Sequence, residues 1–411
     1  MTESHPPAIV PPDSLPLFEE TLDLLALKTA EDEGTLGVEF PHVTEPDGSW
    51  RTWRASISAG YSGTAWSHGN WTCGFWVGLL VAAYHRTGQQ RYLDWAEERM
   101  RLVAPRSADG NTHDIGFIFY GSAIPLHHAT GADWCADLAV AAADRLRARL
   151  IPTRSGAYLS SWGPLSDERG RASSAIDTMA NLSLLYWAAR HIGDGSFHFA
   201  AEAHAKKSWD AFVRTDGSTY HAVEYDTESG ERRRGYTFQG SGDESLWSRG
   251  QGWAIYGLVE TARETGDLDY LRRAERLAQV YIDRLAGAQV PPWDFEDPDP
   301  GRVYDSAAAA IIASALIDLG ALHPDDDAGR RWSDRAVAMM AALCHDFLAR
   351  EPQHRGMLKH GCYSMPHRDG FDSATMFGDF YFVEALCKLV MPGRLLPEAR
   401  WRIGPNRSGE A

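Results

Sequence analysis

The 411-residue sequence predicts an all-α protein, an (α/α)6 barrel in which an inner ring of helices is enclosed by an outer ring. One pattern recurs along the chain: an apolar helical segment, a glycine, a short polar turn and a second helix. The first segment of each copy is apolar on nearly every side, as a helix covered on both sides must be. Six such helical hairpins favour a closed barrel over the alternative, a flat α-solenoid.

The recurring pattern starts at six places in the chain. The first halves begin at Gly78, Ser122, Asn181, Trp253, Ala309 and Phe380. In each, apolar residues lie three and four positions apart, which is the spacing of a helix face. The glycines expected to end these helices in left-handed geometry are Gly88, Gly131, Gly193, Gly266 and Gly320.

The stretches between the hairpins differ in length, so we expect long loops that gather at one end of the barrel and form a pocket. Two of these stretches, residues 156–163 and 217–226, are predicted to form short strand hairpins. We expect one catalytic barrel over residues 15–396. Residues 1–14 and 397–411 are expected to be flexible tails.

Composition narrows the possible partners. The net charge is −16, with 56 acidic and 40 basic residues, which argues against nucleic acid as a partner. We find no apolar run long enough to span a membrane and no secretory signal, and the five cysteines are odd in number and widely spaced. We therefore expect a cytoplasmic protein with no membrane partner. The 15 tryptophans suit either stacking on sugars or a large core.

Two aspartates in the loops are candidate catalytic groups, each with a plainer alternative. Asp177 opens the third repeat, and Asn181 follows it on the same helix face. Ser174 and Asp177 also have the spacing of a capping box, in which the carboxylate would serve the helix end. Asp114 could likewise be a first-turn carboxylate. Spacing alone leaves capping and catalysis both open.

A second candidate site surrounds the start of the fourth repeat. Arg249 has Trp247 and Trp253 nearby in the sequence, and Gln239 precedes them. A guanidinium binds a planar carboxylate while an indole stacks on a sugar ring, although packing of a surface arginine on aromatic rings is the alternative. With the loop tryptophans Trp162 and Trp293, the set indicates a carbohydrate cleft. The motif search gives no metal or cofactor signature, and we expect neither.

The chain resembles the unsaturated glucuronyl hydrolases, glycoside hydrolase family 88. Seven stretches in the family's order carry the resemblance: Trp71–Gly78, His113–Phe117, Ile176–Asn181, Trp247–Trp253, Pro292–Phe295, Asp305–Ala309 and Met376–Ala385. The resemblance implies an (α/α)6 barrel. It also implies removal of the 4,5-unsaturated uronic acid that polysaccharide lyases leave at the non-reducing end of oligosaccharides, the expected substrate.

By this resemblance the reaction hydrates the vinyl ether bond. Asp177 would be the general acid and base, which protonates C4 and helps water to add at C5. Asp177 must therefore keep a proton near neutral pH, which burial or the neighbouring carboxylate of Asp114 would favour. An ionised Asp114 would stabilise the positive charge beside the ring oxygen. The expected substrate-binding residues are His113, His221, Gln239, Trp247, Arg249, Trp253 and the stacking tryptophans Trp71, Trp162 and Trp293.

Two positions depart from the family pattern and put substrate preference in question. Phe238 stands where the family commonly has histidine, and Phe377-Gly-Asp-Phe380 replaces a Trp-Gly-Asp-Tyr type of motif. Three alternatives stay open: an unsaturated rhamnogalacturonyl hydrolase with the same chemistry, a sugar epimerase that uses His221 and His360, and a non-catalytic sugar-binding barrel. The sequence predicts neither the preferred glycan nor the oligomeric state.

Overall fold

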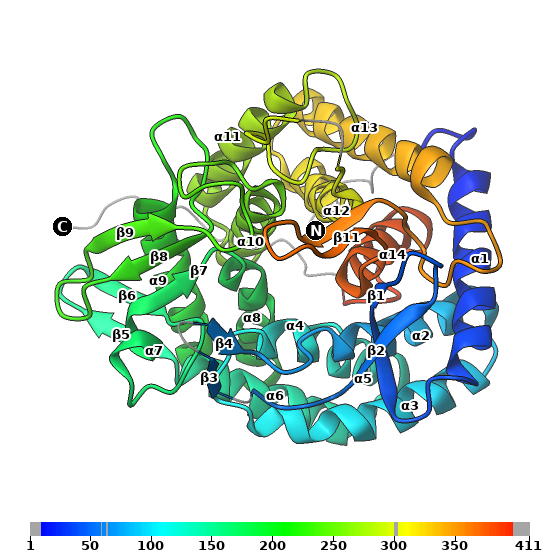
Figure 1. The fold of residues 1–411 in the computed structure, drawn as a ribbon, viewed down its shortest axis with the longest axis horizontal. Coiled ribbons are helices and arrows are strands. Elements are labelled where there is room, and N and C mark those ends of the chain that lie inside the picture. Colours follow the sequence, from blue (N-terminus) through cyan, green and yellow to red (C-terminus); the bar gives the residue numbers. More distant parts are fainter. Residues whose placement is uncertain (1–9, 59, 63–64, 300–302, 398–411) are drawn as a thin grey trace, which may run out of the picture.

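The computed structural model describes residues 10–58, 60–62, 65–299 and 303–397, and it confirms the predicted double ring of helices (Figure 1). The inner ring consists of α2 Cys73–Thr87, α4 Ile115–Tyr120 with α5 Ala123–Thr130, α8 Thr178–Ile192, α10 Ser248–Thr265, α12 Ser306–Leu322 and α14 Met376–Val390. The outer ring consists of α1 Leu15–Glu33, α3 Arg91–Val103, α6 Asp133–Arg147, α9 Gly195–Phe212, α11 Leu268–Leu285 and α13 Asp326–Ala342.

The inner ring closes on itself, because each inner helix packs against the next and α14 packs against α2. The sequence pattern offered no outer partner for the sixth inner helix. The structure supplies α1, which comes from the other end of the chain and packs against both α14 and α2 (Figure 1). Phe18, Leu22 and Leu25 of α1 are buried in this contact. Burial of these side chains stabilises the closed form of the barrel.

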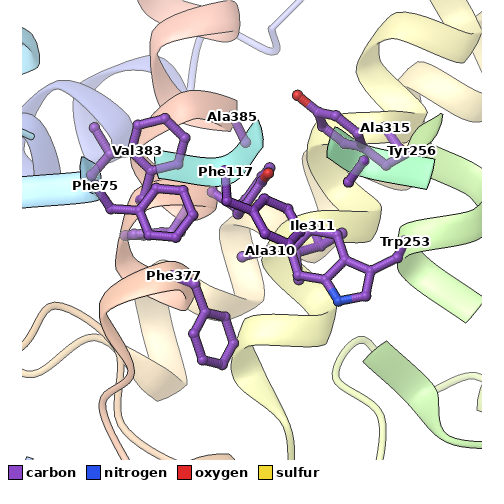
Figure 2. Close-up of a cluster of buried hydrophobic side chains, with 14 of the residues drawn as sticks. Phe75, Phe117, Trp253, Tyr256, Ala310, Ile311, Ala315, Phe377, Val383 and Ala385 are labelled. Carbon is purple, nitrogen blue, oxygen red and sulfur yellow. The ribbon is translucent and has the colours of Figure 1, made fainter. Parts of the chain in front are cut away.

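The inner helices are buried on all sides, as the sequence predicted. Every residue from Ser306 to Ile317 of α12 is buried. The outer helix α11 instead buries one stripe, which contains Tyr270, Ala274 and Leu277. Figure 2 shows aromatic and aliphatic side chains from several inner helices meeting in the centre of the barrel.

Four of the five expected helix-ending glycines are confirmed. Gly88, Gly131, Gly193 and Gly266 follow α2, α5, α8 and α10 with φ between 68° and 72°. The prediction for Gly320 is wrong, because this residue lies inside α12, which ends at Leu322. A Cβ at Gly320 would collide with Ser333 of α13. Its glycine therefore permits close packing of α12 on α13 rather than a turn.

The two expected strand segments contain strands, but neither forms a hairpin within itself. Residues 156–163 contribute β6 Gly156–Leu159, which pairs with the preceding β5 Leu150–Thr153. Residues 217–226 contribute β8 Ala222–Tyr225, which lies between β7 Ser173–Ala175 and β9 Arg232–Tyr236. The other strand pairs were not predicted: β1 Glu39–Thr44 with β2 Trp50–Arg54, β3 Gly60–Ser62 with β4 Ala65–Ser67, and β10 Gly361–Ser364 with β11 Asp369–Ser373.

The loops that precede the inner helices meet at one end of the barrel. Isolated bridges join Thr112 to Trp162, Trp247 to Asp294 and Val43 to Thr375, so loops from different repeats contact one another. Three short helices complete the connections: η1 Ala104–Ala108, α7 Glu168–Ala172 and the π-helix η2 Leu343–Phe347. The two expected tails lie mostly outside the described residues. Within the described part of the chain, no helix is long and apolar enough to cross a membrane.

Candidate active site

The candidate residues lie at the amino-terminal ends of the inner helices. Asp114 directly precedes α4, Asp177 directly precedes α8, and Asp305 directly precedes α12. The free N–H groups and the positive ends of the helix dipoles therefore converge on this end of the barrel. Helix amino termini favour negatively charged groups, and each of these three ends has an aspartate directly before it.

The structure decides against the capping alternative for both catalytic candidates. Neither Asp177 nor Asp114 accepts a hydrogen bond from the first turn of the helix that follows it. Asp305 shows the contrast, because its carboxylate accepts from the N–H of Ala308 at 3.2 Å. The carboxylates of Asp177 and Asp114 are therefore directed to other partners.

These partners are histidines. Nε2 of His113 lies 3.1 Å from Oδ1 of Asp177 and 3.3 Å from Oδ1 of Asp114. On the far side, Oδ2 of Asp114 lies 2.7 Å from Nδ1 of His68 and accepts from Oγ1 of Thr112 at 2.9 Å. The result is a chain of side chains in the order His68, Asp114, His113, Asp177.

The carboxylates of Asp177 and Asp114 differ in how exposed they are. The side chain of Asp177 is 19% exposed, whereas those of Asp114 and His113 are 6% and 2% exposed. Only Asp177 therefore presents its carboxylate to the space outside the protein. His113 has partners inside the protein for both ring nitrogens, since Nδ1 donates to the carbonyl oxygen of Ser161 at 2.7 Å. Its expected contact with substrate stays a prediction.

Neighbouring charges determine the protonation states of His113 and Asp114. Burial disfavours the charged imidazole ring, but Asp114 and Asp177 outweigh it and raise the pKa of His113 to about 9. Burial also disfavours the Asp114 carboxylate, but the adjacent His113 and His68 and the hydrogen bond from Thr112 lower the pKa of Asp114 well below its usual range. At neutral pH the pair is an imidazolium and a carboxylate.

Sequence reasoning missed His68 and Thr112. Both belong to short polar stretches with no motif, and His68 lies 46 positions from Asp114 in a segment between β4 and α2. Thr112 is adjacent to the His113-Asp114 pair, so its position near the site was available from the sequence. The sequence did not reveal that its hydroxyl donates to Asp114, since a threonine three residues before the start of a helix has many alternative partners.

His221 is the second buried histidine of the site. Its Nδ1 lies 3.0 Å from Oγ1 of Thr237, and its Nε2 has no hydrogen-bond partner in the described part of the chain. Burial lowers the pKa of His221 to about 3, so the ring is neutral at neutral pH. Phe238 packs on this ring at 4.0 Å between centroids and is itself 37% exposed. The family departure at Phe238 therefore lies at the site.

Arg249 is buried and has partners within the protein. Its Nη1 lies 2.6 Å from Oδ2 of Asp305 and also donates to the carbonyl of Cys362, while Nη2 donates to the carbonyl of Tyr363 at 2.7 Å. Nε2 of Gln239 donates to the same Tyr363 oxygen at 2.9 Å. Both side chains thus anchor the β10–β11 hairpin, and their contact with a substrate stays a prediction.

Aromatic rings surround the guanidinium of Arg249 as the sequence suggested, with one difference. Its carbon Cζ lies 4.6 Å from the ring of Trp247 and 4.8 Å from Phe377. Trp253 does not take part; it is 2% exposed and packs in the barrel centre beside Phe117, with 5.0 Å between their centroids (Figure 2). Its position is that of a core residue.

The other tryptophans differ in how much surface they offer. Trp162 and Trp293 are 8% and 6% exposed, and the backbone oxygen of Trp293 accepts from Ser248 N at the start of α10. Trp71 is half-buried and stacks on Phe377 with 5.2 Å between centroids. Its indole therefore keeps more free surface than the other two.

One group of side chains has the composition of a metal site. His68, His113 and Asp114 each place one ligand atom within 4.8 Å of the others. The same atoms already contact one another, because both histidine nitrogens lie against the Asp114 carboxylate. We therefore read this cluster, within the described residues, as a hydrogen-bonded chain.

Two carboxylates at the loop end of a closed α-barrel, with Trp162 beside the histidines that contact them, are typical of enzymes that act on carbohydrates. No family model matches the chain. The unsaturated glucuronyl hydrolase of Bacillus sp. (strain GL1) is 34% identical over 370 residues, which span 88% of this chain and 93% of that protein. The crystal structure of this enzyme superimposes with a TM-score of 0.84 at 32% identity, over 93% of this chain and 100% of that one.

A relative with a narrower name supports the same assignment. The unsaturated chondroitin disaccharide hydrolase of Streptococcus pneumoniae (strain ATCC BAA-255 / R6) is 30% identical over 326 residues, which span 77% of this chain and 81% of that protein. The chain belongs to the unsaturated glucuronyl hydrolase family and is a glycoside hydrolase. Membership decides against the epimerase and the non-catalytic barrel.

Proposed function

We propose that the chain releases the 4,5-unsaturated uronic acid from the non-reducing end of lyase-generated oligosaccharides by hydrating the vinyl ether bond. One observation carries the proposal: of the two carboxylates in the hydrogen-bonded series His68, Asp114, His113 and Asp177, Asp177 is the more exposed, at 19% against 6% for Asp114. A substrate at the loop end can therefore contact the carboxyl group of Asp177, whereas that of Asp114 is covered. Asp177 is therefore the group that exchanges protons with the sugar.

The reaction proceeds in three steps. Asp177 gives a proton to C4, and positive charge develops at C5 and the ring oxygen. Asp177, now a carboxylate, takes a proton from the water that adds at C5. The hemiketal that results opens, and the remaining sugar leaves. The separation rule for two carboxylates of ordinary glycosidases does not apply, because the anomeric carbon is not displaced.

Asp114 acts in this reaction as a fixed negative charge. It is buried and ionised, and its acceptor positions are filled by His68, Thr112 and His113. A preorganised charge needs no reorganisation when positive charge appears on the sugar, which is how such groups lower a barrier. Asp114 therefore stabilises the transition state without transferring a proton.

Substrate binding combines local positive potential with aromatic surface. His221 has a buried Nε2 without a hydrogen-bond partner among the described residues, and we propose a sugar hydroxyl or carboxylate oxygen as its partner in the complex. Trp71 supplies stacking surface, and the helix amino termini favour the carboxylate. Trp247, Arg249 and Gln239 shape this region by holding the β10–β11 hairpin.

The substrate class that we propose is fragments of glycosaminoglycan type. Two relatives support this substrate class. The first is the S. pneumoniae protein, which is named for chondroitin disaccharides. A solved unsaturated glucuronyl hydrolase described as specific for heparin is 27% identical, with a TM-score of 0.80 over 91% of this chain and 97% of that one.

The test is ultraviolet absorbance of lyase-generated unsaturated disaccharides mixed with the protein. The double bond conjugated to the carboxylate absorbs, and its hydration product does not. We expect the absorbance to decay with the wild type and to stay constant with Asp177→Asn. Constant absorbance with the wild type across chondroitin, heparin and rhamnogalacturonan disaccharides would contradict the proposal.

A further inference from the structure

The hydrogen bonds of His113 determine where its protons lie. Nδ1 is 2.7 Å from the carbonyl oxygen of Ser161, which can only accept, so Nδ1 carries a hydrogen in every state of the ring. A second ring proton can therefore reside only on Nε2. That nitrogen lies 3.1 Å from Oδ1 of Asp177 and 3.3 Å from Oδ1 of Asp114.

The two carboxylates are unequal as partners for this proton. Asp114 is buried, and its other oxygen, Oδ2, already receives the hydroxyl of Thr112 at 2.9 Å and contacts Nδ1 of His68 at 2.7 Å. No corresponding donor holds Asp177 among the described residues, and its side chain is 19% exposed. The proton on Nε2 can therefore pass to Asp177 more readily than to Asp114.

We propose that His113 stores the proton that Asp177 delivers to C4 of the substrate. The inference rests on the proposed function and adds to it a positioning residue that acts through Asp177. In the resting protein His113 is an imidazolium beside a carboxylate. Transfer of the Nε2 proton to Oδ1 gives a neutral imidazole and a carboxylic acid, and the acid then protonates C4.

His113 and Asp177 return to their starting protonation states after one turnover. After C4 is protonated, the Asp177 carboxylate takes a proton from the water that adds at C5. Asp177 then returns this proton to Nε2 of His113, which restores the imidazolium. No oxidant, metal or further acid is required, and the net change is the addition of one water molecule.

Substrate binding provides a reason for the proton to move. A sugar over Asp177 removes the water that solvates its carboxylate, and loss of solvation disfavours an ion pair relative to the neutral pair. The charge of Asp114 opposes this move and returns His113 to the imidazolium afterwards. The titratable groups that face His113 are Asp114, Asp177, His68, His204 and His221.

The first test is the pH profile of His113→Gln. Glutamine keeps an N–H for Asp177 but cannot release it. We expect kcat to fall about 100-fold, within the range of general acid–base catalysis, with KM changed less than about threefold. The alkaline limb of kcat/KM should move from near pH 9 in the wild type to lower pH by more than about two units. A profile that is lowered but not displaced would overturn the proposal.

His204→Gln is the matched control. His204 is also buried, and it contacts Leu159 N at 2.9 Å and the Ser208 hydroxyl at 3.2 Å rather than a carboxylate. The same substitution there should leave the alkaline limb in place, whatever it does to stability. An equal displacement in His204→Gln would show that the limb does not report on His113 and would overturn the proposal.

A second measurement starts from the wild-type protein and does not require His113→Gln to fold. In protein labelled with ¹⁵N-histidine, we expect both His113 nitrogens to be protonated at neutral pH, with a midpoint near pH 9. In Asp177→Asn the midpoint should fall by at least about one pH unit, because one flanking charge is lost. A neutral ring at pH 7, or an unchanged midpoint, would overturn the proposal. This readout needs no substrate, so its failure is distinct from failure of the hydration assay.

Discussion

The buried ion pair between Arg249 and Asp305 offers a sharp test of how the site is built. The side chains of Arg249 and Asp305 are 3% and 0% exposed, and the pair is joined at 2.6 Å. In Arg249→Ala the Asp305 carboxylate stays buried with no cation beside it. Removing one partner of such a pair costs about 3–5 kcal/mol of the free energy of unfolding. The carbonyls of Cys362 and Tyr363 also lose the guanidinium as a donor, and Tyr363 keeps only the hydrogen bond from Gln239.

The assay is urea unfolding of the wild type and of Arg249→Ala, with steady-state kinetics on the same samples. We expect the free energy of unfolding to fall by at least about 3 kcal/mol. Arg272→Ala is the control, because Arg272 is 68% exposed and pairs with Asp269 at 3.4 Å; it should change stability by less than about 0.5 kcal/mol. A change below about 1 kcal/mol in Arg249→Ala together with a large rise in KM would refute our reasoning and favour direct binding of the uronate by Arg249.

Three further predictions concern packing, electrostatics and pH. Gly257→Ala should lower the free energy of unfolding by about 1–3 kcal/mol in urea, because its Cβ would collide with the backbone of Met179 where α10 crosses α8; Gly242→Ala, with open space around it, is the control. Asp114→Asn should lower kcat about 100-fold in the absorbance assay, with little change in KM; an effect on KM alone would contradict an electrostatic role. The pKa of His113 is raised from 6.5 to about 9, so its contribution to stability is complete below pH 6.5 and is lost as the pH rises through 9. The wild type should therefore lose about 3 kcal/mol relative to His113→Gln between pH 6.5 and 9.5 in urea unfolding, and an equal pH dependence in both proteins would contradict the assignment.

The barrel could be predicted because the sequence signals that define its inner helices are local. Apolar spacing and a terminal glycine define each inner helix within about 20 residues, and four of the five glycines are where the pattern placed them. Gly320 failed because close packing between neighbouring helices selects glycine as strongly as a turn does. Helix α1 could not be assigned as the sixth outer helix, because its contact with α14 joins opposite ends of the chain.

Residues of the site could be predicted from the sequence only where they belong to a recognisable motif. Asp114 and Asp177 were candidates from their places in the loops, the resemblance implied their roles, and the structure brings both to the same histidine. Arg249 has the local surroundings of an anion-binding residue, and nothing near it in sequence reveals that Asp305, 56 positions later, neutralises it. Contacts that span such distances depend on the tertiary structure and leave no periodic signal.

The most direct test of the central claim is the position and configuration of deuterium after turnover in D₂O. If Asp177 protonates C4, the deuteron enters from one face of the sugar. The uronic acid product, trapped at once by borohydride, should then carry one deuterium at C4 in a single configuration. A product labelled equally on both faces, or released with its double bond intact, would contradict protonation of C4 by Asp177.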